Sequence, residues 1–227
     1  MKKRLDGLVN FVEEGKIVAD IGSDHGITAI KIFEEKRPRK VIATDISENS
    51  LEKLREKLRN NPNLDIETKV TDGIEDLKDY GLENIIISGM GGYLIADIVK
   101  EGLDVARGCE RLILQANNSL EHLRRFLRAK DFSILDEVMV YEEGKYYTII
   151  LASPLGLKED YSPLDYKYGK KLMEKKDPVF IDYLDFRLRE LGLIYENIKN
   201  IDTRAANLRR KKLLEEEKEI GGLKACL

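Results

Sequence analysis

Two glycines and two carboxylates share the segment Asp20-Ile-Gly-Ser-Asp-His-Gly26, which follows an apolar stretch that is typical of a strand. Gly22 permits a tight turn, and Gly26 lets a following helix approach the sheet or a ligand closely. Asp24 replaces the middle glycine of a dinucleotide fingerprint, where its charge would oppose a pyrophosphate. A carboxylate suits a cationic sulfonium cofactor with an ammonium group. We therefore expect S-adenosylmethionine rather than NAD, with a ligand-free structural turn as the alternative.

Polar side chains of this turn are candidate cofactor ligands. They are Asp20, Ser23 and His25, because each would lie at the carboxyl end of the first strand. For His25 we expect a hydrogen-bonding role near the cofactor. His122, the other histidine, lies in a predicted helix and is interpreted as a surface residue.

Two further acids end predicted strands. Asp45 stands about 20 residues beyond the glycine-rich turn, where an acid accepts hydrogen bonds from both ribose hydroxyls of an adenosine. We assign Asp45 and the adjoining Ile46 to the cofactor. Asp72, followed by Gly73, would accept from the exocyclic amine of the adenine, although an ordinary Asp-Gly turn explains this pair nearly as well.

The fourth predicted strand runs into Ser88-Gly-Met-Gly-Gly92. Glycines at a strand end indicate close approach of the backbone to a ligand. We assign Gly89 and Met90 to the cofactor, and Gly91 and Gly92 to the methyl acceptor. The Asn/Asp-Pro-Pro-aromatic motif of amino-methyltransferases is absent here, which indicates an acceptor other than an exocyclic amine.

The fifth predicted strand ends with two amides, Gln115 and Asn117, which we assign to substrate binding. Amides pair well with nucleobase edges, but they also cap turns, so the amides alone do not decide between these two uses.

Apolar strands and amphipathic helices alternate over the first 150 residues, which predicts a parallel sheet covered on both faces. The last two strands, 132–140 and 146–151, have no helix between them, so they predict an antiparallel pair at one edge. This combination is typical of Rossmann-like class I methyltransferases. We place this α/β domain at residues 1–153.

A helical module is predicted for residues 154–227. Ser162-Pro163 and Asp177-Pro178 each read as an N-cap followed by proline at the first helical position. Gly192 is expected to interrupt or end the second helix. Heptad spacing predicts an antiparallel hairpin with a coiled-coil seam, formed by Leu184, Leu188 and Leu191 on one helix and by Ile194, Ile198, Ile201, Ala205 and Leu208 on the next.

Composition narrows the class of protein. Two cysteines occur among 227 residues, and neither has metal-ligand spacing, so we expect no metal and a reducing compartment. The longest apolar run, near 85–99, is too interrupted to span a bilayer. We therefore expect a cytoplasmic protein without a membrane partner. Residues 160–227 carry a slight basic excess, whereas the rest of the chain is net acidic.

Three strings, Ala19-Asp-Ile-Gly-Ser-Asp-His25, Ser88-Gly-Met-Gly-Gly92 and Leu112-Ile-Leu-Gln115, closely resemble the bacterial tRNA (adenine-N1)-methyltransferase family that modifies adenine 22. The resemblance continues through Lys3-Arg4-Leu5, Asp136-Glu137 and Glu143-Gly-Lys145 to the helical tail. Among the departures, Ile27 stands where an aromatic residue is common, and Ala116 replaces a proline.

The resemblance implies a methyltransferase domain followed by a tail that helps to hold tRNA. Adenine N1 has a free lone pair, so its in-line attack needs proximity more than a base. We assign Asp24 to stabilising the cationic product and Arg4 to phosphate contact. The alternatives are a non-catalytic RNA- or protein-binding scaffold and a small-molecule methyltransferase. We expect a monomer or a homodimer.

Overall fold

The computed structural model of the protein describes residues 3–157 and 159–227. The chain divides into two compact units, one ending at Lys171 and one that runs Leu172–Leu227. Residues 154–171, which we grouped with the helical module, therefore fall in the first unit. The first two residues of the predicted domain lie outside the described ranges. Within those ranges, no helix combines the length and apolar character that crossing a membrane requires.

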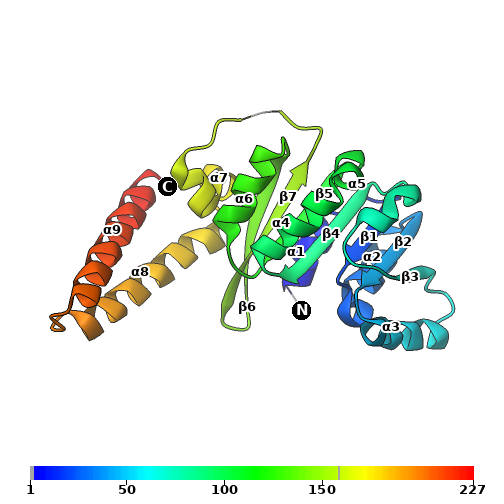
Figure 1. Cartoon of the computed structure of the whole chain (residues 1–227), viewed down its shortest axis with the longest axis horizontal. Helices are drawn as coiled ribbons and strands as arrows, with labels where there is room; N and C mark the ends of the chain where they lie inside the picture. The colour runs from blue at the N-terminus through cyan, green and yellow to red at the C-terminus, as the bar shows by residue number, and fades with distance from the viewer. Residues whose placement is uncertain (1–2, 158) are drawn as a thin grey trace. The chain divides into compact units, whose positions relative to one another are not determined.

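The first unit is built on one seven-stranded sheet (Figure 1). In spatial order its strands are β3 (Ile66–Val70), β2 (Lys40–Asp45), β1 (Ile17–Ile21), β4 (Asn84–Met90), β5 (Arg111–Ala116), β7 (Lys145–Ser153) and β6 (Ser133–Glu142). Strands β1 to β5 pair in parallel, whereas β7 is antiparallel to both of its neighbours. The predicted Rossmann-like sheet, with its antiparallel pair at one edge, is confirmed.

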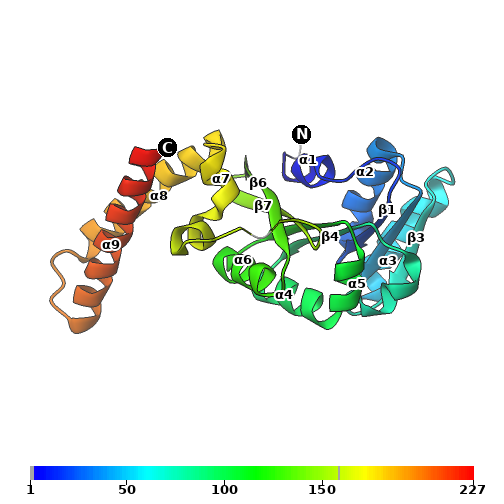
Figure 2. The same ribbon diagram turned by 90° about the horizontal axis from the view of Figure 1, so that it is seen from above.

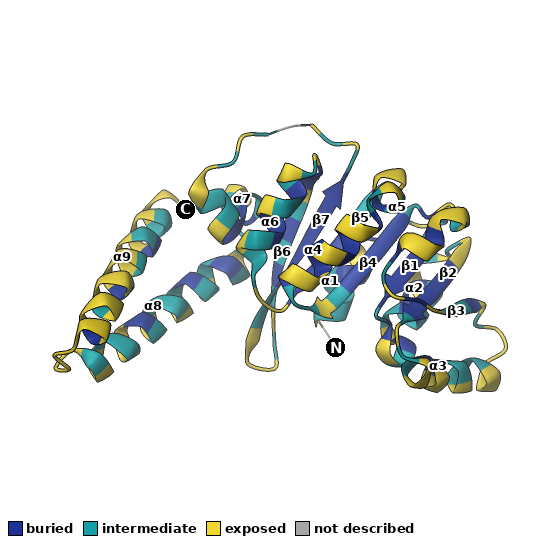
Figure 3. Cartoon of the chain, viewed as in Figure 1, coloured by how far each residue is buried: buried dark blue, intermediate teal, exposed yellow. Residues whose placement is uncertain are grey.

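Helices cover both faces of this sheet (Figure 2). One face carries α1 (Lys3–Asn10), α2 (Ile27–Lys36) and α3 (Glu48–Asn60), and the other carries α4 (Gly92–Glu101), α5 (Leu103–Gly108) and α6 (Leu120–Ala129). Successive residues of β4 alternate between the two cores, since Ile85 and Ile87 join one and Ile86 the other. Both faces are therefore buried, which explains the continuous apolar strands (Figure 3).

Side-chain caps start α3 and, as predicted at Ser162, the helical segment that follows the sheet. The Ser47 hydroxyl accepts from the backbone amide of Ser50 at the start of α3. Ser162 accepts from the amide of Asp165 at 3.2 Å, and the Asp165 carboxylate accepts from the amide of Ser162 at 2.6 Å. This reciprocal pair starts a short helical segment, η3 (Asp165–Gly169) and α7 (Lys170–Glu174).

The second unit contains a helical hairpin of α8 (Pro178–Ile198) and α9 (Arg204–Cys226). Asp177 caps α8 through its carboxylate, with Pro178 at the start of the helix, as predicted. Leu184 and Leu191 of α8 are buried, and an ion pair of 2.8 Å joins Arg187 to Glu216 across the two helices. The antiparallel hairpin is confirmed.

The predicted helix break and the predicted seam of the tail are wrong. Gly192 neither interrupts nor ends α8, because one glycine costs a helix only about 1 kcal/mol and no cap or proline follows it. Ile201, predicted to lie in the seam, sits in the turn between the helices and is 46% exposed. Thr203 caps a new helix there, so the apparent heptad crossed a helix boundary. Ile194 and Ile198 lie in α8 rather than in the second helix, and Ala205 and Leu208 are exposed. The buried residues of α9 are instead Ala206, Leu213 and Ile220.

Candidate functional site

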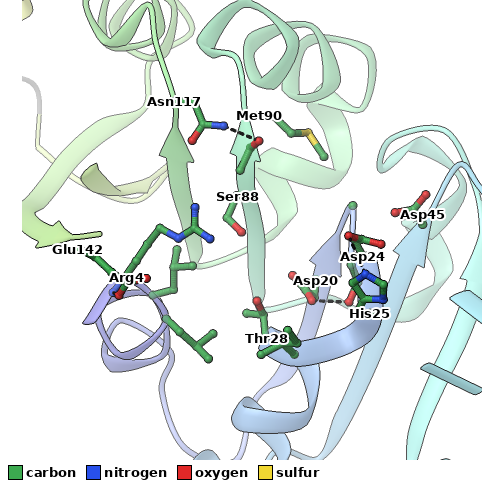
Figure 4. Close-up of a pocket in the computed structure, with 16 residues that line it drawn as sticks. Arg4, Asp20, Asp24, His25, Thr28, Asp45, Ser88, Met90, Asn117 and Glu142 are labelled. Carbon is green, nitrogen blue, oxygen red and sulfur yellow. Dashed lines mark hydrogen bonds and ion pairs between the residues drawn. The ribbon is translucent and has the colours of Figure 1, made fainter. Parts of the chain in front are cut away.

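A cavity of about 440 Å³ opens where the carboxyl ends of the parallel strands meet. Its wall contains ten of the residues that the sequence singled out, namely Arg4, Asp20, Gly22, Ser23, Asp24, His25, Asp45, Gly89, Met90 and Asn117. Figure 4 shows that these side chains come from elements far apart in the sequence. This is the position at which open α/β sheets bind ligands.

The glycine-rich turn gives the cavity its floor. Gly22 has a φ of +70°, and a side chain there would collide with Met90. His25, with a φ of 59°, adopts the left-handed conformation without being glycine, and its carbonyl accepts from Lys57 Nζ at 2.7 Å. His25 Nε2 lies 3.4 Å from Asp24 Oδ2 at the rim (Figure 4). The turn therefore presents both side chains to the cavity mouth.

The Asp20 carboxylate is the buried charge of this site. It is only 2% exposed and accepts from Ser23 Oγ at 2.5 Å. Burial raises its pKa to about 6, although the hydrogen bonds from Ser23 and from the backbone of Ala29 oppose the rise. A cation placed beside Asp20 would relieve this penalty, so the site favours a positively charged ligand.

The Asp45 carboxylate, at the end of β2, lines another part of the cavity wall. Its Oδ1 accepts from the amide of Ser47 at 2.8 Å, and among the described residues no hydrogen bond uses the second oxygen. This oxygen meets the requirement for a ribose ligand at the end of a second strand. Ile46, Asp72 and Gly73 lie outside the lining of the cavity.

The end of β4 and the loop that follows it are held by two amides, one in β5 and one just after it. Gln115 Oε1 accepts from the amide of Gly89 at 3.1 Å, Asn117 Nδ2 donates to the carbonyl of Gly89 at 2.7 Å, and the two side chains bond each other at 3.0 Å. Asn117 lines the cavity. Gln115 is fully buried outside the lining, so it positions the loop and does not face the cavity.

Packing explains three glycines that the sequence linked to ligands. A side-chain carbon on Gly92 would lie 2.6 Å from the carbonyl oxygen of Ser119, and one on Gly91 would lie 3.3 Å from Asn118. Gly26 packs against Leu54 in the same way. By contrast, Gly89 has a φ of +79° and nothing near its missing side chain, so only this glycine of the loop opens the cavity.

The side of the cavity opposite Asp45 includes residues that sequence reasoning missed. Glu142 Oε2, at the end of β6, accepts from the backbone amide of Arg4, whose guanidinium lies 5.0 Å from the ring centre of Tyr147. Leu8 and Thr28 were missed as well, whereas Leu5, Ile27 and Ser88 stood in the motifs or departures noted in the sequence but were given no role. No motif pointed to Glu142, because it reaches the cavity through the antiparallel turn of the sheet edge.

The charge of the lining selects the kind of ligand. Among the described residues, it contains four carboxylates and a single guanidinium, that of Arg4. A pyrophosphate would be repelled here, whereas a sulfonium and an ammonium group would be attracted. No cluster of three or more metal-ligating side chains occurs in the described part of the chain.

A family model described as Methyltransferase domain matches residues 1–150. The Bacillus subtilis (strain 168) tRNA (adenine(22)-N(1))-methyltransferase is 30% identical over 225 residues, which cover 97% of this chain and 94% of that protein. The crystal structure of Streptococcus pneumoniae Sp1610 in complex with S-adenosyl-L-methionine is 28% identical and covers 99% of both chains, with a TM-score of 0.85.

A third comparison agrees with these two. The B. subtilis m1A22 tRNA methyltransferase TrmK is 27% identical in its crystal structure, with a TM-score of 0.80, and the match covers 99% of this chain and 98% of that one. The family expected from the motifs is therefore confirmed. This chain belongs to the methyltransferase-domain family and, within it, to the tRNA (adenine(22)-N(1))-methyltransferase family.

Proposed function

We propose that this protein transfers the methyl group of S-adenosylmethionine to N1 of an adenine in tRNA, with position 22 as the target. The observation that carries the proposal is the cavity at the strand ends, with a buried acid on its floor and a second acid at the adenosine side. The B. subtilis relative, named for this activity, covers 97% of the chain.

The residues of the cavity fit the cofactor. Asp45 would hold the ribose, while Asp20 and Ser23 would face the methionine part, whose ammonium group complements the buried carboxylate. Gly89 brings backbone close to the ligand without a side chain in the way. When bound, S-adenosylmethionine supplies an electrophilic methyl group on a sulfonium centre.

The acceptor adenine would enter from the opposite side, between Ser88, Asn117 and Arg4. One oxygen of Glu142 accepts from the Arg4 amide, and its other oxygen would accept from the exocyclic amine of the base. This contact would turn N1 toward the methyl group. N1 keeps its lone pair at neutral pH, so alignment contributes more than proton removal. Asp24, exposed at the rim, remains our candidate for stabilising the cationic product.

The direct test is to map the methylated base. We expect incubation of the protein with unmodified tRNA and labelled cofactor to give 1-methyladenosine at position 22, as read by nuclease digestion and mass spectrometry. A tRNA with guanosine at that position is the matched control and should remain unlabelled. N6-methyladenosine, or label at other positions only, would contradict the proposal. Binding of tRNA without any methylation would favour the scaffold alternative.

We further infer that residues from 154 onward raise tRNA affinity. On α9, Arg209, Lys211 and Lys212 are exposed, whereas Arg210 donates to the carbonyls of Ile198 and Ile201 and ends α8. Changing Arg209, Lys211 and Lys212 to Gln should weaken tRNA binding. The slope of log affinity against log salt should become shallower by about 0.7–0.9 for each phosphate that the variant no longer binds. Filter binding at several salt concentrations measures both effects.

The matched control for this tail variant is Glu217→Gln, an exposed acid on the same helix. Its removal should leave the salt slope unchanged. Cofactor affinity, measured by calorimetry, should stay at the parent value in both variants. If the triple variant kept the parent slope while a sizing column showed a dimer dissociating, the hairpin would be an oligomerisation element instead.

A further inference from the structure

Two aromatic rings are stacked on the surface just outside the cavity. Tyr93 lies in the first turn of α4 and His122 in the first turn of α6, with ring centres 3.9 Å apart and planes inclined by 23°. Tyr93 is 60% exposed. We propose that this pair, the Tyr93–His122 stack, is a platform on which an unpaired base of the tRNA next to the target adenine stacks. The inference rests on the proposed function and assigns a substrate contact to residues outside the cavity.

The backbone fixes the Tyr93–His122 stack at the acceptor side. The amide of Gly92 donates to the carbonyl of Asn118 at 3.2 Å, and the amide of Asn117 donates to the carbonyl of Met90 at 2.8 Å. These bonds hold together the two segments that precede α4 and α6. Since Met90 and Asn117 line the cavity, the two stacked rings stand on helices that start directly after cavity-lining segments.

Cations and rings continue the surface along α6. Arg125 follows His122 by about one helical turn, and its guanidinium lies 4.3 Å from the ring centre of Tyr166. Arg128, about one turn further on, lies 5.2 Å from the ring centre of Tyr161, but its guanidinium donates to the carbonyls of Phe132 and Glu159, so Arg125 is the cation that could meet a phosphate. Proteins that bind single-stranded RNA commonly combine aromatic and guanidinium planes, on which bases stack, with cations that contact the phosphates.

The chemistry of the target favours a base as the occupant. A base that is methylated at N1 must leave its stack, and its neighbours then lose a stacking partner. A solvent-facing ring beside the cavity offers a replacement for one of them. Arg125 pairs with Glu121 at 2.8 Å, but both side chains are about half exposed, so exchanging this ion pair for a phosphate costs little.

A fluorescent side chain at position 93 tests the contact directly. The chain has no tryptophan, so Tyr93→Trp introduces a single indole reporter. We expect its fluorescence to be quenched on titration with tRNA and with an unpaired oligoribonucleotide. Leu94→Trp is the matched control, because Leu94 is its neighbour on α4 and is also exposed. An equal response of the two variants, or none from Tyr93→Trp, would overturn the proposal.

Affinity measurements complete the test. Tyr93→Ala should weaken tRNA binding about tenfold, which is about 1.4 kcal/mol, while Tyr93→Phe should stay within about twofold of the parent. Leu94→Ala should bind as the parent does, and cofactor affinity should be the same in all variants. Parent-like tRNA affinity of Tyr93→Ala would also refute the platform. A parent protein that failed to methylate tRNA would refute the proposed function, and the oligoribonucleotide titration would still decide the stacking.

Discussion

Asp20→Asn is expected to make the protein without cofactor more stable and cofactor binding weaker. The Asp20 carboxylate is buried, and its pKa of about 6 compares with an ordinary value of 3.8. At pH 7 its ionisation therefore costs the folded protein about 3 kcal/mol, which a neutral amide removes. The same charge would attract the ammonium group of S-adenosylmethionine, so cofactor affinity should fall about ten- to hundredfold.

The sign of the pH dependence follows from the raised pKa. Protonation of Asp20 favours the folded state, an effect that is complete below pH 3.8 and lost as the pH rises through about 6. The advantage of Asp20→Asn in free energy of unfolding should thus shrink from about 3 kcal/mol at pH 7 to about 1 kcal/mol at pH 4.5. Urea unfolding without cofactor at both pH values measures it.

A second carboxylate of the same cavity is the control for this prediction. Asp45 is only partly buried, so Asp45→Asn should weaken cofactor binding without stabilising the protein. For the parent, cofactor affinity should also decrease below about pH 6, because protonated Asp20 no longer attracts a cation. An Asp20→Asn variant with parent stability and parent affinity would show that Asp20 carries no buried charge facing the ligand.

The fold followed from local patterns that the structure confirms. Buried strands alternate with capped helices, and the last two strands lack a crossover helix, so the antiparallel edge was predictable. The polar residues at the ends of β1 and β2, such as Asp20 and Asp45, were predictable for the same reason, because parallel strand ends share one edge of the sheet.

Residues whose roles depend on contacts with segments distant in the sequence were not predictable. Glu142 meets Arg4 only because β6 returns beside α1, which no local pattern specifies. Gln115 and Gly92 are residue types that binding loops use. In the structure, however, Gln115 bonds the backbone of Gly89, and Gly92 packs against the backbone of Ser119. Amides and glycines serve packing and ligands equally well, so sequence cannot separate the two uses.

The ion pair between Arg124 and Glu137 is another feature that sequence did not indicate. Their side chains are 1% and 0% exposed, and Arg124 Nε donates to Glu137 Oε1 at 2.7 Å. Arg124 also donates to the carbonyls of Tyr166 and Lys167, and Glu137 Oε2 accepts from the amide of Lys171. The pair thereby fixes residues 166–171 to α6 and β6.

Removing either partner should strongly destabilise the first unit. Arg124→Met leaves a buried carboxylate without its cation, and Glu137→Gln leaves a buried guanidinium without its carboxylate, so each should lower the free energy of unfolding by about 3–5 kcal/mol. The double variant Arg124→Met with Glu137→Gln should lose less than the sum of the single losses, because neither charge remains. Urea unfolding of the full chain, followed by near-ultraviolet circular dichroism, measures the three values.

Arg125→Met is the matched control for the ion pair. It removes the neighbouring arginine of α6, whose partner Glu121 is about as exposed as Arg125 itself, so the expected loss is below about 1 kcal/mol. The difference in stability between Arg124→Met and Arg125→Met reports the effect of burial, since both variants replace an arginine of α6 with methionine. If Arg124→Met lost no more stability than Arg125→Met, the buried pair would be dispensable. Residues 166–171 would then be held to α6 by the apolar and aromatic contacts around them.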